Sequence, residues 1–135
     1  MKPMISAAVG AAVTVIVLAG CATSTSATVP TGADLQGTWA QSGAGFERGR
    51  HVTWNDQTLV IEGAEGPGFV GFKEYTREGE EPQKEIVNGV VGVDGEIRIV
   101  DEDGFFEGRM VDGKILGQYV EIGDDHAAIN VELTQ

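Results

Sequence analysis

Residues 93–113 read VDGEIRIVDEDGFFEGRMVDG, and this stretch decides the fold class. Asp-Gly occurs in it at 94–95, 103–104 and 112–113, at a constant spacing of nine residues. Asp-Gly between apolar, β-prone runs is a strong signal for a β-hairpin, because a type I′ turn needs positive φ at both of its central residues. The stretch therefore predicts consecutive antiparallel strands joined by tight turns.

The same pattern continues on both sides of this stretch. Gly123-Asp124-Asp125 predicts another turn downstream, and Ala64-Glu65-Gly66-Pro67 predicts a hairpin upstream. We predict strands over 35–41, 58–63, 68–76, 84–93, 96–102, 105–111, 114–122 and 126–134, with 51–54 as a short extra strand or part of the next one. About eight strands in up-and-down order predict an all-β antiparallel meander. Closure into a barrel is favoured over a two-sheet sandwich, because closure removes the exposed edges.

Counting outward from the Asp-Gly pairs as two-residue turns predicts the register. Ile97 then faces Gly92 and Met110, and Phe106 faces Tyr119. Because a slip of one residue moves every side chain to the other face, the mainly apolar face is predicted as the core. That face collects Val90, Ile97, Ile99, Phe106, Met110, Ile115, Tyr119, Ile129, Val131 and Leu133.

Several polar and aromatic side chains gather at one end of this inner face, near the turns at 103–104 and 123–125. They are Asn88, Asp101, Phe106, Tyr119 and Glu121. An apolar wall with a few convergent polar groups is what a small-molecule site requires. These residues are therefore the candidate ligand-binding set, and a solvent-wetted rim at the barrel mouth is the alternative.

The amino-terminal segment carries the signal for location. Lys2 precedes an uncharged apolar run over 4–19, which is short for a membrane span and typical of a signal-peptide core. Leu18-Ala19-Gly20-Cys21 at its end resembles the lipobox of bacterial lipoproteins. The resemblance implies removal of residues 1–20 and attachment of diacylglyceryl and acyl chains at Cys21. An uncleaved amino-terminal helix, or a plain secretory signal cut near Ala22, is the alternative.

Cysteine use and the next segment fit the lipoprotein interpretation. Cys21 is the chain's single cysteine and has no disulfide partner, so lipidation supplies its role. Residues 22–33, ATSTSATVPTGA, are small and uncharged and predict a flexible tether. The expected parts are a signal peptide (1–20), a lipidated cysteine and tether (21–33) and a barrel domain (34–135). Membrane lipid is the expected partner, on the outer face of the plasma membrane or in the outer membrane of a two-membrane bacterium.

Short motifs in the barrel domain resemble the calycin group of small barrels, and its avidin-like branch in particular. Gly37-Thr38-Trp39 matches the opening of the first strand in that branch. The stretches 58–63 with 68–75, and 117–120 leading to 128–130, resemble its later strands. The resemblance implies a barrel that can hold one small ligand.

The departures from the avidin-like pattern exclude biotin from the expected ligands. Biotin binders of that branch line the pocket with several tryptophans, a serine or threonine set and a late aspartate. This domain has Trp39 and Trp54 alone, Ser42 as its single serine, and no aspartate after Asp125.

Composition narrows the function classes. The net charge of −12 argues against nucleic acid as a partner, because nucleic-acid binding needs a basic face. With Ser42 as the one serine of the domain and no cysteine, a Ser-His-Asp or Cys-His hydrolase is not expected.

Metal and cofactor sites are not expected either. The acidic stretch 101–104 lacks the distal glutamate and flanking helices of a calcium-binding EF-hand. Glu121 with Asp124, Asp125 and His126 is better explained as a charged surface turn than as a divalent-ion site. The expected function is therefore non-catalytic binding of a small amphipathic ligand. A structural or interaction module that binds a protein or cell-wall partner through its outer surface is the alternative, and the oligomeric state is left open.

Overall fold

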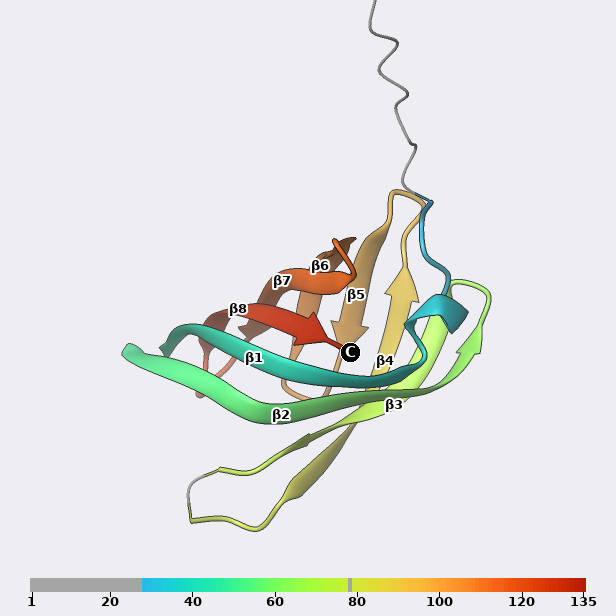
Figure 1. The fold of residues 1–135 in the computed structure, drawn as a ribbon. Helices are drawn as coiled ribbons and strands as arrows, with labels where there is room; N and C mark the ends of the chain where they lie inside the picture. Colours follow the sequence, from blue (N-terminus) through green and yellow to red (C-terminus); the bar gives the residue numbers. More distant parts are fainter. Residues whose placement is uncertain (1–27, 78) are drawn as a thin grey trace, which may run out of the picture.

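The protein folds as a closed antiparallel β-barrel, seen in a computed structural model that describes residues 28–77 and 79–135 (Figure 1). The expected signal peptide, Cys21 and the first part of the expected tether lie outside the described residues. Each strand pairs with the next, and β8 closes the barrel against β1. The strands are β1 (Gly37–Glu47), β2 (Arg50–Glu65), β3 (Gly68–Tyr75), β4 (Gln83–Val91), β5 (Glu96–Val100), β6 (Gly104–Val111), β7 (Lys114–Glu121) and β8 (Ala127–Thr134). The predicted eight-stranded meander and its closure are confirmed.

The first hairpin is longer than the sequence predicts. β1 continues to Glu47, and Arg48 and Gly49 form the turn with φ of 49° and 75°, the positive values that a tight hairpin needs. The predicted short strand over 51–54 is the beginning of β2. A β-bulge at 55–56, where Asp56 has a φ of 59°, interrupts the pairing inside this long strand.

The predicted register is correct from β6 onward. Asp112 and Gly113 have φ of 50° and 80°, as a type I′ turn requires, and Phe106 pairs with Tyr119. Between β5 and β6, however, Ile97 pairs with Gly108 instead of Met110. The cause lies in the turn, which centres on 102–103 and not on Asp103-Gly104. This shift of two residues leaves the inner face unchanged.

The predicted register between β4 and β5 is wrong by one residue. Ile97 pairs with Val91, because Gly92–Gly95 forms the turn and the N–H of Gly95 donates to the carbonyl of Gly92 at 2.9 Å. A register shift by an odd number of residues exchanges the inner and outer faces of β4. Val91 is therefore buried, whereas Val90 is 43% exposed.

The two ends of the barrel differ. A 3-10 helix, η1 (Ala33–Leu35), replaces the predicted start of the first strand and closes one end, where the indole N–H of Trp39 donates to the carbonyl of Leu35 at 2.9 Å. Gly32, assigned by sequence to the tether, is buried, and its N–H donates to Gly66 at 3.1 Å. Figure 1 shows the β4–β5 turn beside the start of the described chain and the β3–β4 hairpin extending at the other end.

Among the residues that the structure describes, sixteen buried apolar ones fill the barrel from the η1 end. Trp39, Ile97 and Ile115 are among the largest fully buried ones. Among the described residues, no helix has the length and apolar character needed to cross a membrane.

Candidate functional site at the barrel mouth

A cavity of about 450 Å³ opens at the end of the barrel opposite η1, and we name it the mouth cavity. Its walls come from the end of β1, the first half of β2, the end of β3 and the residues after it, the start of β4, the β5–β6 turn and the end of β7. The lining residues are Glu47, Val52, Thr53, Trp54, Asn55, Gln57, Lys73, Tyr75, Thr76, Arg77, Glu85, Asp103, Tyr119 and Glu121.

Strand alternation explains why polar side chains enter this end of the barrel. In β3, Phe69 and Gly71 are buried, so Lys73 and Tyr75 continue the same inward series. In β4, Glu85 belongs to the inward series of the fully buried Val87. The inward series of both strands thus change from apolar to polar near the mouth.

The bulge in β2 brings an aromatic side chain into the cavity. Gln57 lies on the inner face with the buried Leu59, and simple alternation would then point Trp54 outward. The bulge at 55–56 adds one residue to β2 relative to β1, so the indole of Trp54 also faces the barrel interior.

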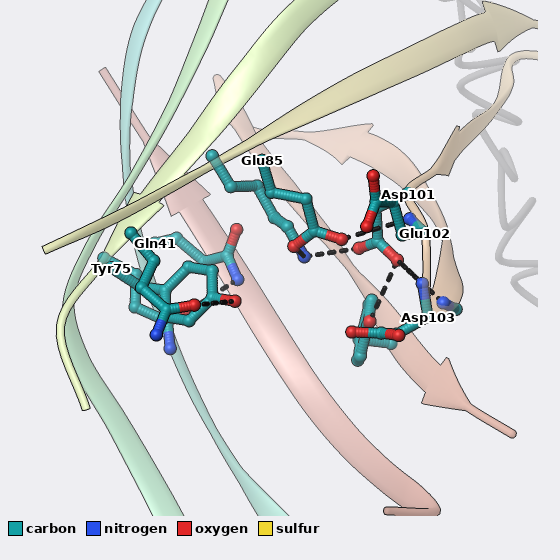
Figure 2. Close-up of polar contacts among 11 residues, drawn as sticks. Gln41, Tyr75, Glu85, Asp101, Glu102 and Asp103 are labelled. Atoms are coloured by element: carbon teal, nitrogen blue, oxygen red, sulfur yellow. Dashed lines mark hydrogen bonds and ion pairs between the residues drawn. The ribbon is translucent and has the colours of Figure 1, made fainter. Parts of the chain in front are cut away.

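The floor of the mouth cavity is a charged cluster around Lys73. Its ammonium pairs with the carboxylates of Asp101 and of Glu85, the latter at 3.1 Å. The side chains of Lys73, Glu85 and Asp101 are only 15%, 11% and 4% exposed. Figure 2 shows the two carboxylates pointing toward one another, one from β4 and one from the residue after β5. One cation between two carboxylates leaves the cluster with an excess negative charge.

Asp101 also organises the β5–β6 turn. Its carboxylate accepts hydrogen bonds from the N–H groups of Asp103 at 3.0 Å and Gly104 at 2.7 Å. The carboxylate of Glu85 accepts one from the N–H of Glu102 at 3.0 Å. Together these bonds hold the turn against the charged cluster, which is why the turn centres one residue earlier than Asp103-Gly104.

Tyr119 connects the charged cluster to the aromatic wall. Its hydroxyl donates to Asp101 at 3.2 Å, and its ring lies 5.3 Å from that of Trp54, tilted by 58°. The Lys73 ammonium lies 5.0 Å from the centre of the Tyr119 ring and 5.8 Å from that of Tyr75. Both tyrosine rings therefore lie within cation–π range of this ammonium.

The electrostatics keep Lys73 and Tyr119 protonated at neutral pH. Burial alone would lower the pKa of the Lys73 ammonium, but the hydrogen bond and charge of Asp101, with those of Glu85, outweigh it and raise that pKa. Burial, and then the charges of Asp101 and Glu121, raise the pKa of the Tyr119 phenol. Burial likewise raises the pKa of the Glu121 carboxyl, and nearby acidic charges raise it further.

The five sequence-predicted site residues divide into three groups. Tyr119 and Glu121 line the mouth cavity. Asp101 and Phe106 lie beneath it, around a void of about 20 Å³ that has room for no more than a single water molecule. Asn88 is exposed on the outer face, so its predicted inward position is wrong, and the one-residue error at the β4–β5 turn is the reason.

Sequence reasoning missed most of the cavity wall. Lys73 and Glu85 could have been found by extending the inward series of Phe69 and Val87 along their strands, with a period of two. Trp54 offered no such signal, because the bulge reverses the alternation.

The described part of the chain offers no group of three histidine, cysteine or acidic residues placed to hold a metal ion. The mouth cavity instead combines a buried charged floor, aromatic rings and rim carboxylates. Such an arrangement can hold a small molecule by charge, hydrogen bonds and ring contacts.

Comparisons with known proteins support the fold. No protein-family model and no curated protein matches the chain. A crystal structure of a structural genomics protein of unknown function from Bacteroides ovatus is similar, with a TM-score of 0.52 and 12% sequence identity. The match covers 74% of this chain and 41% of the other, so this chain spans about two fifths of that structure. At this identity the similarity is one of fold.

Proposed function

We propose that the protein is a lipid-anchored lipoprotein of the bacterial envelope whose barrel binds a small amphipathic ligand without catalysis. The lipobox-like stretch ending at Cys21 supports the anchor, and the eight-stranded barrel is consistent with the resemblance to calycin-type binders. The observation that carries the binding proposal is the mouth cavity, about 450 Å³ in volume with aromatic and charged walls. Ligand sites of this kind commonly have volumes of ~300–1,000 Å³.

The chain enters the barrel at the end opposite the mouth cavity, and this arrangement supports a route for the ligand from solution. Val29 lies against Gly95 in the β4–β5 turn, so the chain enters the barrel at the closed end. The mouth cavity is lined from the opposite ends of the strands. A lipid on Cys21 would therefore leave the mouth free to face the solution, and the ligand would arrive from there.

Native mass spectrometry of the protein purified in mild detergent from its host's membranes tests both parts. The expected mature protein begins at Cys21 and carries acyl chains, which are absent from a Cys21→Ala variant and kept in a Ser24→Ala control. An unlipidated mass for the wild type would overturn the anchor.

The same spectra test the cavity. We expect a bound small molecule that is lost from Trp54→Leu and retained by Phe46→Leu, which removes an aromatic ring that is 58% exposed on the outer face. Circular dichroism of both variants verifies that the barrel is intact. Equal retention by the two variants would place the molecule outside the mouth cavity.

The alternative function, an interaction module that binds an envelope partner through its outer surface, has one observation in its favour. Ile86, Val70 and Val100 on β3–β5 are 72%, 50% and 51% exposed, and the barrel below the mouth is filled with side chains. Under this alternative, Ile86→Lys would abolish binding to the partner while Trp54→Leu would leave it unchanged.

A further inference from the structure

We propose that the ligand of the mouth cavity is a small organic cation, an amine or quaternary ammonium with an apolar body. This inference rests on the proposed function and specifies the chemical class of its ligand. Two independent features of the cavity lead to it, its charge and its aromatic wall.

The first feature is uncompensated negative charge. Four carboxylates line the cavity, from Glu47, Glu85, Asp103 and Glu121, against the two cations Lys73 and Arg77. The Lys73 charge is already taken up by Asp101 and Glu85 in the floor. Entry of a further cation would therefore neutralise charge, whereas an anion would meet the rim carboxylates.

The second feature is an aromatic face available to a cation. Lys73 lies over Tyr119 at 5.0 Å, and Arg77 lies over Tyr75 at 5.7 Å. Within residues 28–77 and 79–135, Trp54 is the remaining aromatic ring of the cavity wall, and no lysine or arginine lies over its indole. Tryptophan is the strongest of the aromatic side chains in cation–π binding. The indole of Trp54 therefore offers a face for the ligand's cationic group or its apolar body.

Glu121 is the carboxylate best suited to pair with such a ligand. It lies at the end of β7, two residues after Tyr119, and lines the cavity. Burial and the charges of Asp103 and Glu47 raise the pKa of its carboxyl, and the positive charge of Arg77 offsets them only in part, so the ionised form needs more positive charge nearby. A bound ammonium group would supply that charge. A raised carboxyl pKa means that the folded state disfavours the ionised form, so at pH values above the ordinary pKa of 4.5 the charge of Glu121 lowers stability. Removing this charge by Glu121→Gln is therefore expected to leave the fold intact.

Three probes that share a benzyl group but differ in charge test the inference: benzyltrimethylammonium, benzyl alcohol and phenylacetate. They are titrated into the full chain in a nonionic detergent, and the readout is the indole ¹H–¹⁵N NMR spectrum. The chain has two tryptophans, so Trp54 at the mouth and the buried Trp39 give separate signals, which Trp54→Phe assigns.

We expect the cation to shift the Trp54 signal at the lowest concentration while the Trp39 signal stays in place. Glu121→Gln should weaken binding of the cation by roughly fivefold, the size of one partly exposed charge interaction. Glu107→Gln is the matched control, because it removes the same charge from the outer face, where Glu107 pairs with Arg98.

The outcomes distinguish this inference from the proposed function. Tighter binding of phenylacetate or benzyl alcohol at Trp54 would overturn the cation inference and leave small-molecule binding in place. Equal weakening by Glu121→Gln and Glu107→Gln would also overturn it, since general electrostatics would then explain the preference. If none of the three probes moved the Trp54 signal, both the inference and the proposed binding function would fail.

Discussion

Lys73 is the residue on which the mouth end of the barrel depends. Its ammonium is the positive charge between Asp101 and Glu85, two carboxylates with little access to solvent. Removing one partner of a buried ion pair costs much more than removing one from an exposed pair, because the remaining charge stays desolvated.

Lys73→Met therefore has a specific expected cost. The substitution keeps the unbranched shape of the side chain, one atom shorter, and leaves two acidic groups facing each other. It should lower the free energy of unfolding by about 3 kcal/mol. Lys114→Met is the control, because Lys114 pairs with Glu132 at 2.9 Å with both side chains more than 40% exposed. That change should cost less than about 1 kcal/mol. Urea denaturation measures both, and equal losses would contradict the special role of Lys73.

Alkaline pH should destabilise the protein. The pKa values of Lys73, Tyr75 and Tyr119 are all raised in the folded state from ordinary values of 10.5, 10.0 and 10.0. Groups with raised pKa values contribute stability that is complete below the unfolded-state pKa and is lost as pH rises through the folded-state pKa.

The urea midpoint should accordingly hold steady up to about pH 9 and fall from about pH 10 upward. Tyr119→Phe removes one of the three groups and should make the fall shallower. A urea midpoint that stays constant or increases as the pH is raised to about 11.5 would show that folding does not favour the protonated forms.

Only part of the site was predictable at the residue scale. Tyr119 and Glu121 follow from the register of β7, where the turn chemistry is local and simple. Asp101 was placed correctly on the inner face, but its contact with Lys73 joins residues 28 positions apart, one in β3 and the other just after β5. No local pattern in the sequence encodes that contact.

At the scale of elements, turn geometry separates the correct registers from the incorrect ones. At 112–113 the φ values of 50° and 80° are those of a type I′ turn, so the predicted register holds there. Near 103–104 the Asp101 carboxylate accepts hydrogen bonds from two backbone N–H groups, and the turn centres on 102–103 instead. At 94–95 the preceding Gly92 accepts the turn hydrogen bond and lengthens the loop. Strand order was predictable because short hairpin turns place each strand beside the next one in the chain.

Gly113→Ala tests the turn that determines the register of β6 and β7. Gly113 has a φ of 80°, and a Cβ at this position would meet no other atom within 4 Å, so backbone strain is the whole expected effect. The free energy of unfolding should fall by about 1 kcal/mol. Asp112→Asn should change it by no more than a few tenths, since Asn-Gly suits the same turn. Thermal unfolding of the two variants measures both changes. An unchanged stability for Gly113→Ala would show that an alanine at this φ adds no backbone strain.

At the scale of the whole molecule, the barrel is polarised along its axis. The end where the described chain begins is closed by η1 and Trp39, the middle is apolar, and the far end is acidic and open. If Cys21 carries the anchor, the closed end should be nearer the membrane. The expected tether has a random-coil reach of only ~20 Å, comparable with the length of the barrel itself.

Lipid quenching measures this orientation directly. Because Cys21 is the single cysteine and would be acylated, Glu65→Cys and Asp124→Cys each provide one thiol for a fluorescent label, at the closed end and the mouth end respectively. In vesicles with spin-labelled headgroups, the label in Glu65→Cys should be quenched more strongly than the label in Asp124→Cys. Adding Cys21→Ala should abolish quenching at both positions. Equal quenching with the anchor present would mean that the barrel has no preferred orientation, and stronger quenching in Asp124→Cys would place the mouth cavity against the lipid surface.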